Sequence, residues 1–219
     1  MSTPVTEFYG AYAALYDRLA RYALGSRRWR AEAVTALDLQ PGDTVVDVGC
    51  GTGASFPYLR RAVGSQGRVI GIDLTPELLS RARRHAARWS NVAVVHGTAT
   101  CLPLDTRIDG ILGCFVVGLL DDPAAVVETW RRAVGSNGRV ALLDGLPTGW
   151  APPLDRMFAA LVSAWTPPTA RDGVTDRLTR KVAAAHGRLR ILGPRSTTAS
   201  HALGFVRMTA GDGEDPPST

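Results

Sequence analysis

The segment from Thr44 to Gly53 reads TVVDVGCGTG, and it sets the architecture expected for the chain. Its first five residues are mostly β-branched, which predicts a strand over Thr44–Val48. Three glycines follow at alternate positions. Glycine lets the backbone turn sharply off a strand end and lets a ligand approach without a Cβ in the way. The segment therefore predicts a strand that runs into a ligand-binding loop.

A short apolar run, a turn and a segment of helical spacing alternate along residues 44–143. The helix after the glycines is expected to end at Gly64, and Thr75 followed by Pro76 is typical of a helix start. Asp122 is expected to begin another helix. Strands that alternate with helices at this spacing predict a parallel, doubly wound α/β sheet. The expected strands are Thr44–Val48, Arg68–Ile72, Val92–Val95, Ile108–Leu112 and Arg139–Leu143.

Both flanks of this region have other patterns. Residues 8–39 are expected to form one or two helices, and Leu178–Ala185 another. The strands Leu189–Leu192 and His201–Val206 are expected to close the sheet as an antiparallel hairpin, which brings it to seven strands. The expected divisions are an N-terminal helical lid over 1–40, an α/β domain over 41–209 and a disordered polar tail over 210–219.

The composition excludes several classes of protein. The chain has 219 residues, 45% hydrophobic and 21% charged, which suits one globular domain. No apolar run approaches ~18 residues and the N-terminus lacks a signal-peptide pattern, so we expect a cytoplasmic protein. The three cysteines have no zinc-ligand spacing, so we expect buried, reduced thiols and no metal site.

Two acidic residues accompany the glycines. Asp47 lies two residues before the first glycine, and Asp73 follows the second expected strand. In a doubly wound sheet both reach the carboxyl edge, where ligands bind. Asp47 can accept hydrogen bonds from a ligand amine, and Asp73 can hold two vicinal ribose hydroxyls. A tight turn with a helix-capping Asp73 is an alternative explanation. It does not account for the whole series of strand, acid, three glycines, second strand, acid and helix.

A nicotinamide dinucleotide is a second ligand compatible with these residues. Gly49, Gly51 and Ala54 fit the loose dinucleotide fingerprint. However, Asp47 would repel a pyrophosphate. The single lysine, Lys181, also has no tyrosine four residues before it.

The segment Val45–Gly53 resembles the first motif of class I S-adenosylmethionine-dependent methyltransferases, and Ile70–Asp73 resembles their second. Within the class the chain is most similar to the small-molecule branch that includes the ubiquinone and menaquinone C-methyltransferases (methyltransferase type 11 domain). The resemblance covers residues 8–145, and it implies a Rossmann-like fold and S-adenosylmethionine as cofactor. Later segments that also match in order are Gly97–Leu104, Ile108–Ile111 and Gly138–Asp144.

The resemblance also implies site residues. Thr98 departs from the family, which commonly has an acid there to contact the adenine amino group. Residues 114–120 contain no histidine, so no base is implied after the fourth strand. The candidate catalytic residues are Tyr16, His96 and Asp144. The expected cofactor-binding residues are Tyr16, Asp47, Gly49, Cys50, Gly51, Thr52, Gly53, Asp73, Leu74, Thr98, Ala99, Thr100, Cys114 and Phe115.

The acceptor of the methyl group is expected to be small and largely apolar: a quinone precursor, an aromatic metabolite or a lipid. The apolar residues 115–120 and the tryptophan-rich segment 146–165 suggest such a pocket. No motif for methylating a nucleobase is present, so nucleic acid is not expected as a partner, despite the net charge of +5. Contact with an anionic membrane surface, and a monomer or homodimer, stay open. The alternatives are an NAD(P)-dependent oxidoreductase and a non-catalytic S-adenosylmethionine-binding protein.

Overall fold

The computed structural model describes residues 25–102, 106–147, 155–156, 159–160, 163, 172–192 and 195–214. The expected lid before residue 25 and most of the segment 148–171 lie outside the described residues. In the described part, seven strands form one sheet in the order β3-β2-β1-β4-β5-β7-β6. The strands are β1 (Thr44–Val48), β2 (Arg68–Asp73), β3 (Val92–His96), β4 (Gly110–Cys114), β5 (Arg139–Gly145), β6 (Thr197–His201) and β7 (Val206–Asp212).

Strand direction follows the expected pattern. The strands β1 to β5 pair in parallel, and β7 pairs antiparallel with both β5 and β6. The doubly wound, mostly parallel sheet with a closing antiparallel hairpin is therefore confirmed. Because the five parallel strands share one direction, their carboxyl ends meet at a single edge, which we call the carboxyl edge.

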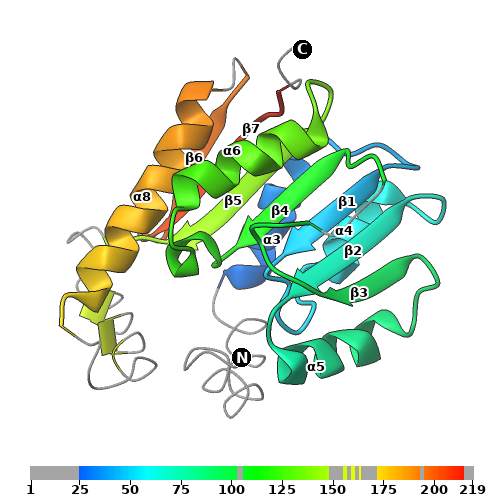
Figure 1. The fold of residues 1–219 in the computed structure, drawn as a ribbon, viewed down its shortest axis with the longest axis horizontal. Coiled ribbons are helices and arrows are strands. Elements are labelled where there is room, and N and C mark those ends of the chain that lie inside the picture. Colours follow the sequence, from blue (N-terminus) through cyan, green and yellow to red (C-terminus); the bar gives the residue numbers. More distant parts are fainter. Residues whose placement is uncertain are drawn as a thin grey trace.

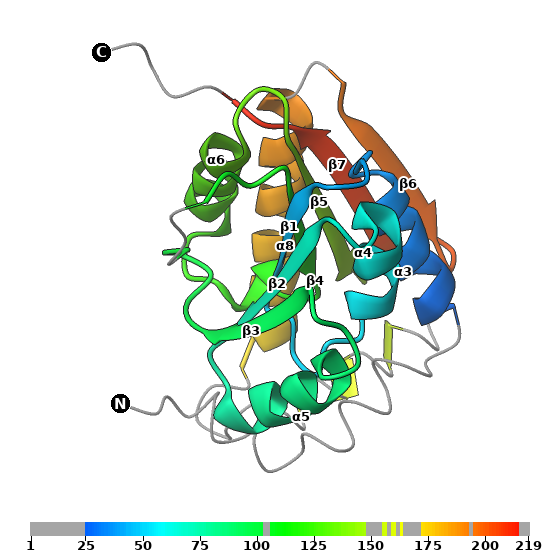
Figure 2. The same cartoon turned by 90° about the vertical axis from the view of Figure 1, so that its right-hand side faces the viewer.

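Helices cover both faces of this sheet, as Figure 1 shows from one side and Figure 2 after a quarter turn. On one face lie α3 (Ser26–Thr35), α4 (Phe56–Val63) and α5 (Pro76–Ala86). On the other lie α6 (Pro123–Val134) and α8 (Val174–Leu192). A short 3₁₀ helix, η1 (Val117–Leu119), follows β4.

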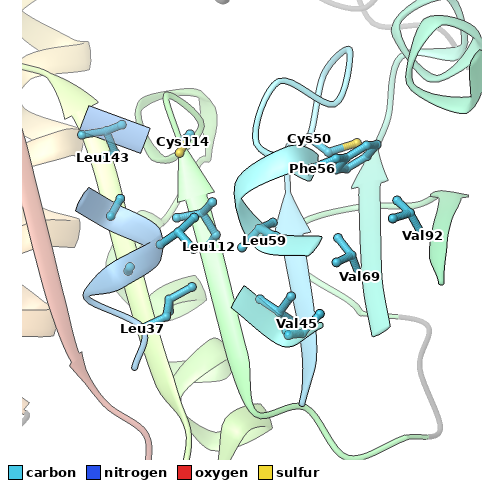
Figure 3. Packing of buried hydrophobic residues seen from close by; sticks show 14 of the residues in the cluster. Leu37, Val45, Cys50, Phe56, Leu59, Val69, Val92, Leu112, Cys114 and Leu143 are labelled. Atoms are coloured by element: carbon cyan, nitrogen blue, oxygen red, sulfur yellow. The ribbon is translucent and has the colours of Figure 1, made fainter. Parts of the chain in front are cut away.

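Alternation along β1 divides the core into two layers. Val45 belongs to the cluster under α3 and α4, whereas Val46 belongs to the cluster under α6 and α8. Both side chains are fully buried, as expected for a strand covered on both faces. Figure 3 shows the first cluster, with Cys50 and Phe56 side by side at the end of β2. Asp47 lies on the same side of β1 as Val45. Its carboxylate is therefore directed into the layer between the sheet and α3.

Local signals place several helix ends. Asp122 caps α6, because its Oδ1 accepts a hydrogen bond from the Ala125 amide at 3.1 Å. Pro123 then begins the helix, where a missing amide hydrogen costs nothing. Gly64 ends α4 with a φ of 70°, a conformation that favours glycine. Both helix-end predictions, the start of α6 at Asp122 and the end of α4 at Gly64, are confirmed.

The C-terminal part of the chain differs from the sequence prediction. Leu189–Leu192 is the end of α8 rather than a strand, because Val182, Ala185 and Leu189 continue one buried helical face. Residues 202–205 form the turn between β6 and β7, so the hairpin lies on either side of the expected second strand. The strand β7 also continues to Asp212, past the expected start of the tail. Cys101 is exposed, whereas Cys50 and Cys114 are buried as expected.

Ion pairs explain why β7 extends beyond residue 209. Asp212 is 3% exposed, and its Oδ2 accepts hydrogen bonds from the amide and the Nε of Arg195 at 3.2 Å each. Its Oδ1 lies 3.6 Å from the Nε of Arg139, its register partner on β5. These contacts lie at the amino end of β5, away from the carboxyl edge.

Replacement of Asp212 by asparagine should therefore destabilise the fold without altering the carboxyl edge. The substitution removes the negative charge that compensates Arg139, which is half-buried. We expect Asp212→Asn to lower the free energy of unfolding by about 1–3 kcal/mol, measured by urea denaturation. The matched control is Asp121→Asn, whose exposed carboxylate lies 4.0 Å from Lys181. Solvent screens that exposed pair, so its loss should change stability much less, and equal losses in the two variants would contradict the prediction.

Candidate functional site

The glycine loop after β1 has the backbone conformation that its sequence suggests. Gly49, Gly51 and Gly53 have φ values of 66°, 55° and 80°. Such left-handed conformations are accessible to glycine at little cost. A Cβ on Gly49 would also lie 2.5 Å from Cγ2 of Val116, so the loop is pressed against the chain that follows β4. Larger residues at Gly49 are therefore excluded by both strain and contact.

Asp73 joins the end of β2 to this loop. Its Oδ2 accepts a hydrogen bond from the Gly51 amide at 2.8 Å, and its Oδ1 accepts one from the Thr75 amide at 2.9 Å. Burial raises the pKa of the Asp73 carboxyl, while these hydrogen bonds act in the opposite direction. Hydrogen bonds from the Thr75 side chain and the Leu74 backbone also act on this carboxylate, which is therefore held firmly at the end of β2.

Asp47 is a buried carboxyl group with an unused oxygen. It is 1% exposed, and among the described residues its Oδ2 has no hydrogen-bond partner. Burial raises its pKa to about 7, although the nearby positive charge of Arg30 counteracts this effect. The negative charge of Asp73 raises the pKa further. A buried polar atom without a partner is costly in the free protein, and it marks a place prepared for a donor group.

Arg30 faces Asp47 from α3 and is only 5% exposed. Its guanidinium carbon lies 5.4 Å from the centre of the Phe115 ring. A cavity of about 10 Å³, roughly the space of one water molecule, opens between these groups. Its wall combines both charges with the loop and the end of β4: Arg30, Asp47, Gly49, Cys50, Thr52, Ala54, Ser55 and Cys114.

On its other side, α3 is attached to the hairpin. Glu32 lies 2.9 Å from Nε2 of His201 on β6, and the Trp29 ring stacks on the His201 ring with centroids 6.2 Å apart. The glycine loop has a second support from α5, where Nδ1 of His85 lies 2.6 Å from the Thr52 carbonyl oxygen. The helix α5 therefore contacts the glycine loop directly, and α3 is fixed by the hairpin.

The ends of β2 and β3 form a second part of the carboxyl edge. Leu74 is 48% exposed although it is large and apolar. The Thr100 amide donates to Oγ1 of Thr98 at 3.0 Å, which closes a tight turn. Trp130 of α6 fixes this turn from the other side, since its Nε1 donates to the Ala99 carbonyl at 2.8 Å. His96 lies 3.1 Å from the Leu74 carbonyl oxygen and is exposed.

The end of β4 is apolar and strained. Phe115 has a φ of 57°, which is rare for a residue with a side chain. It leads into η1, where Leu119 is 48% exposed.

Burial raises the pKa of Cys114 to about 12 and that of Cys50 well above its ordinary value. Both thiols therefore stay neutral and are not poised as nucleophiles.

Most of the site residues expected from the sequence lie along one edge. The described members, from Asp47 to Phe115, end or follow β1, β2, β3 and β4. Asp144 ends β5 but faces the α8 side of the sheet, and Tyr16 lies outside the described residues. The sequence did not predict the inward orientation of Arg30 or the contact of His85. Neither has a local signal, because arginine and histidine on helices are usually at the surface.

The described residues contain neither a membrane-spanning helix nor a metal-binding cluster. Within the described ranges, no helix is both long and apolar enough to cross a membrane. The same residues contain no group of histidine, cysteine, aspartate and glutamate side chains arranged to hold a metal ion.

Because the pKa of Asp47 is raised, the free energy of unfolding should depend on pH. In the folded protein this carboxyl has a pKa of about 7, whereas an aspartate in the unfolded chain has a pKa of 3.8. Stability therefore falls as the pH rises through this window, by up to roughly 4 kcal/mol, and it recovers below it. Asp47→Asn should raise the free energy of unfolding above pH 7, and the gain should vanish near pH 4. A gain of equal size at both pH values, measured by denaturant titration, would contradict this explanation.

Comparisons with known proteins agree with the geometry. The family model of the methyltransferase domain matches residues 45–138. The 2-phytyl-1,4-naphtoquinone methyltransferase of Thermosynechococcus vestitus is 33% identical over 77% of this chain and 76% of its own. The demethylmenaquinone methyltransferase of Shouchella clausii is 33% identical over 54% of this chain and 52% of its own. For several other curated relatives, the chain spans about half of their length or less.

A solved structure supports the same fold. The S-adenosylmethionine-dependent methyltransferase of Aquifex aeolicus superposes with a TM-score of 0.59 at 19% identity, covering 92% of this chain and 97% of that one. The cofactor of this family is S-adenosylmethionine rather than a nicotinamide dinucleotide, and the glycine loop and two acids occupy the expected edge. The chain therefore belongs to the S-adenosylmethionine-dependent methyltransferases.

Proposed function

We propose that this chain transfers the methyl group of S-adenosylmethionine to a small, largely apolar acceptor that carries an aromatic hydroxyl. The observation that carries the proposal is the Asp47 carboxylate, which is buried, lacks a partner at Oδ2 and faces Arg30 across the small cavity. An amino acid has one positive and one negative end group. The negative charge of Asp47 is complementary to the ammonium group of an amino acid, and the positive charge of Arg30 is complementary to its carboxylate.

The described residues suit each part of the donor. Asp47 would accept from its ammonium group and Arg30 would hold its carboxylate, beside a loop whose left-handed backbone conformation glycine adopts at little cost. Asp73 would accept hydrogen bonds from the ribose hydroxyls. The adenine would lie between the exposed Leu74 and the turn of Thr98, Ala99 and Thr100, which Trp130 holds in place. S-adenosylmethionine supplies a methyl carbon activated by the sulfonium, which the end of β4 would face.

The proposed acceptor follows from the wall that lies next to that methyl position. Residues 115–120 are apolar apart from Gly118, and Leu119 presents its side chain to the outside. Two relatives of this chain are named as methyltransferases of naphtoquinone and menaquinone compounds. We extend that acceptor class to this chain. The N-terminal lid expected over residues 1–40 and an apolar pocket in segment 146–165 are also part of the proposal.

Donor binding should depend on the charge of Asp73. Asp73→Asn keeps one acceptor oxygen but loses the charged acceptor for the ribose hydroxyls. We expect S-adenosylhomocysteine, titrated by calorimetry, to bind about 1–3 kcal/mol more weakly to this variant. Asp109→Asn is the control, because Asp109 accepts from the Thr44 amide at 2.9 Å at the opposite end of the sheet. Unchanged affinity in Asp73→Asn, or binding of NAD by the wild type, would contradict the assignment.

Acceptor specificity is tested with a labelled donor. The wild type should transfer radiolabel from S-adenosylmethionine to reduced naphthoquinones or phenols, giving an extractable organic product. Phospholipids and tRNA serve as comparison acceptors. Labelling of tRNA alone would overturn the acceptor class. Donor binding without labelling of any acceptor would favour the alternative, a non-catalytic S-adenosylmethionine-binding protein.

A further inference from the structure

A buried polar network lies at the end of β5, outside the donor cavity. Nε2 of His186 on α8 is 3.2 Å from Oδ2 of Asp144, and Nδ1 is 2.9 Å from Oγ1 of Thr209 on β7. The exposed fractions of Asp144, His186 and Thr209 are 2%, 2% and 1%. We call these three residues the β5 network. It joins three elements, and the proposed donor site uses none of its members.

The chemistry of these groups fixes the direction of the hydrogen bonds for a neutral imidazole. An ionised carboxylate only accepts, so Nε2 of His186 carries the hydrogen and donates to Asp144. Nδ1 then accepts from the hydroxyl of Thr209. Among the described residues only His186 donates to Asp144, and it uses Oδ2. The carboxylate is therefore oriented through one oxygen, and Oδ1 receives no hydrogen bond from the described part of the chain.

The network borders the same region as the apolar wall after β4. Asp144 follows Leu142 on the face of β5 that α8 covers. The helix η1 packs against α8 on that face, because a Cβ on Gly118 would lie 3.1 Å from Leu178 and 3.3 Å from Val182. His186 lies one turn beyond Val182 on α8. The buried Asp144 carboxylate and the helix η1, which carries the exposed Leu119, thus both lie on the α8 side of the sheet.

Asp144 lies near the end of β4, although its side chain is on the α8 side of the sheet and the donor cavity is on the α3 side. Its neighbour Leu143 is the register partner of Cys114, and adjacent strands lie about 4.8 Å apart. Cys114 lines the cavity that contains Asp47. The negative charge of Asp144 is one of the influences that raise the pKa of Cys114, although burial is the largest. The carboxylate therefore lies within electrostatic reach of the end of β4.

We propose that Asp144 is the catalytic base that removes the hydroxyl proton of a hydroquinone-type acceptor, and that His186 and Thr209 are positioning residues that orient it. The inference rests on the proposed function, because the acceptor must approach the methyl group at the end of β4. A carboxylate beside an apolar wall suits a molecule with a flat apolar body and one ionisable hydroxyl.

The step conserves atoms and electrons. The hydroxyl proton passes to Oδ1 of Asp144, and the electron pair of the O–H bond stays on the acceptor. That pair, on oxygen or delocalised to the neighbouring ring carbon, forms the bond to the methyl carbon. The S–C bond breaks and its electron pair stays on sulfur, leaving neutral S-adenosylhomocysteine. Attack through carbon gives a ketone that regains aromaticity by moving the ring proton to oxygen. Asp144 finally releases its proton to water.

The test compares variants with 1,4-naphthohydroquinone as the acceptor, kept reduced under nitrogen. Asp144→Asn should lower kcat by about 10²–10⁴-fold, the usual contribution of a general base. S-adenosylhomocysteine affinity, measured by calorimetry, should change by less than about twofold, because Asp144 is not a donor ligand in this proposal. Thr209→Val and His186→Gln should lower kcat by smaller factors, since glutamine keeps a donor for Oδ2.

A second readout separates a base from a structural residue. The rates are measured with substituted naphthohydroquinones whose hydroxyl pKa values span the assay pH. An acceptor that is already ionised needs no base, so the deficit of Asp144→Asn should shrink as the acceptor becomes more acidic. A deficit that is equal for every acceptor indicates a structural role and overturns the proposal. The control Asp212→Asn, also buried, should lose stability and keep the wild-type kcat.

Each remaining outcome also decides the proposal. A kcat of Asp144→Asn within threefold of wild type rejects it. If that variant does not fold, Thr209→Val carries the same test of acceptor acidity. A wild type that binds S-adenosylhomocysteine but methylates no naphthohydroquinone rejects the acceptor class, and this inference with it. Failure to bind S-adenosylhomocysteine would instead reject the proposed function itself.

Discussion

Parallel pairing of β1 with β2 and β4 is the constraint on which the candidate site depends. Because β1 lies between these strands, three segments that are distant in the sequence end at the same edge. Asp47, Asp73 and Cys114 are neighbours for this reason alone. The glycine loop adds the backbone geometry, and contacts from Asp73 and from His85 of α5 hold that loop in position. The strand order therefore determines which side chains meet at the site, and the individual side chains then determine its chemistry.

At the carboxyl edge, the requirements of protein stability and of ligand binding oppose each other. Asp47 is removed from water, and the Arg30 charge only partly compensates for that burial. An uncharged residue would suit the empty protein better. A carboxylate is useful there only when a positively charged group arrives to complete the pair. Retention of such a group in a well-packed region is typical of binding sites.

Sequence reasoning succeeded where the signals are local. The glycines, the residues Asp122 and Pro123, and Gly64 each fix the backbone within a few positions. It failed over residues 189–206, since Leu189-Arg190-Ile191-Leu192 suits a strand as well as a helix until α8 packs on the sheet. Arg30 was missed because its burial depends on where α3 docks. Asp144 was a candidate, but its partner His186 is 42 residues away and no pattern in the sequence connects them.

The position of β7 has a consequence for folding during synthesis. This strand lies inside the sheet, between β5 and β6, yet it comes from residues 206–212. Until those residues leave the ribosome, β5 is an open edge of seven residues, nearly all of them buried in the finished protein. Unpaired apolar edges promote aggregation, so the nascent chain must pass through a vulnerable stage that ends only when its last strand is added.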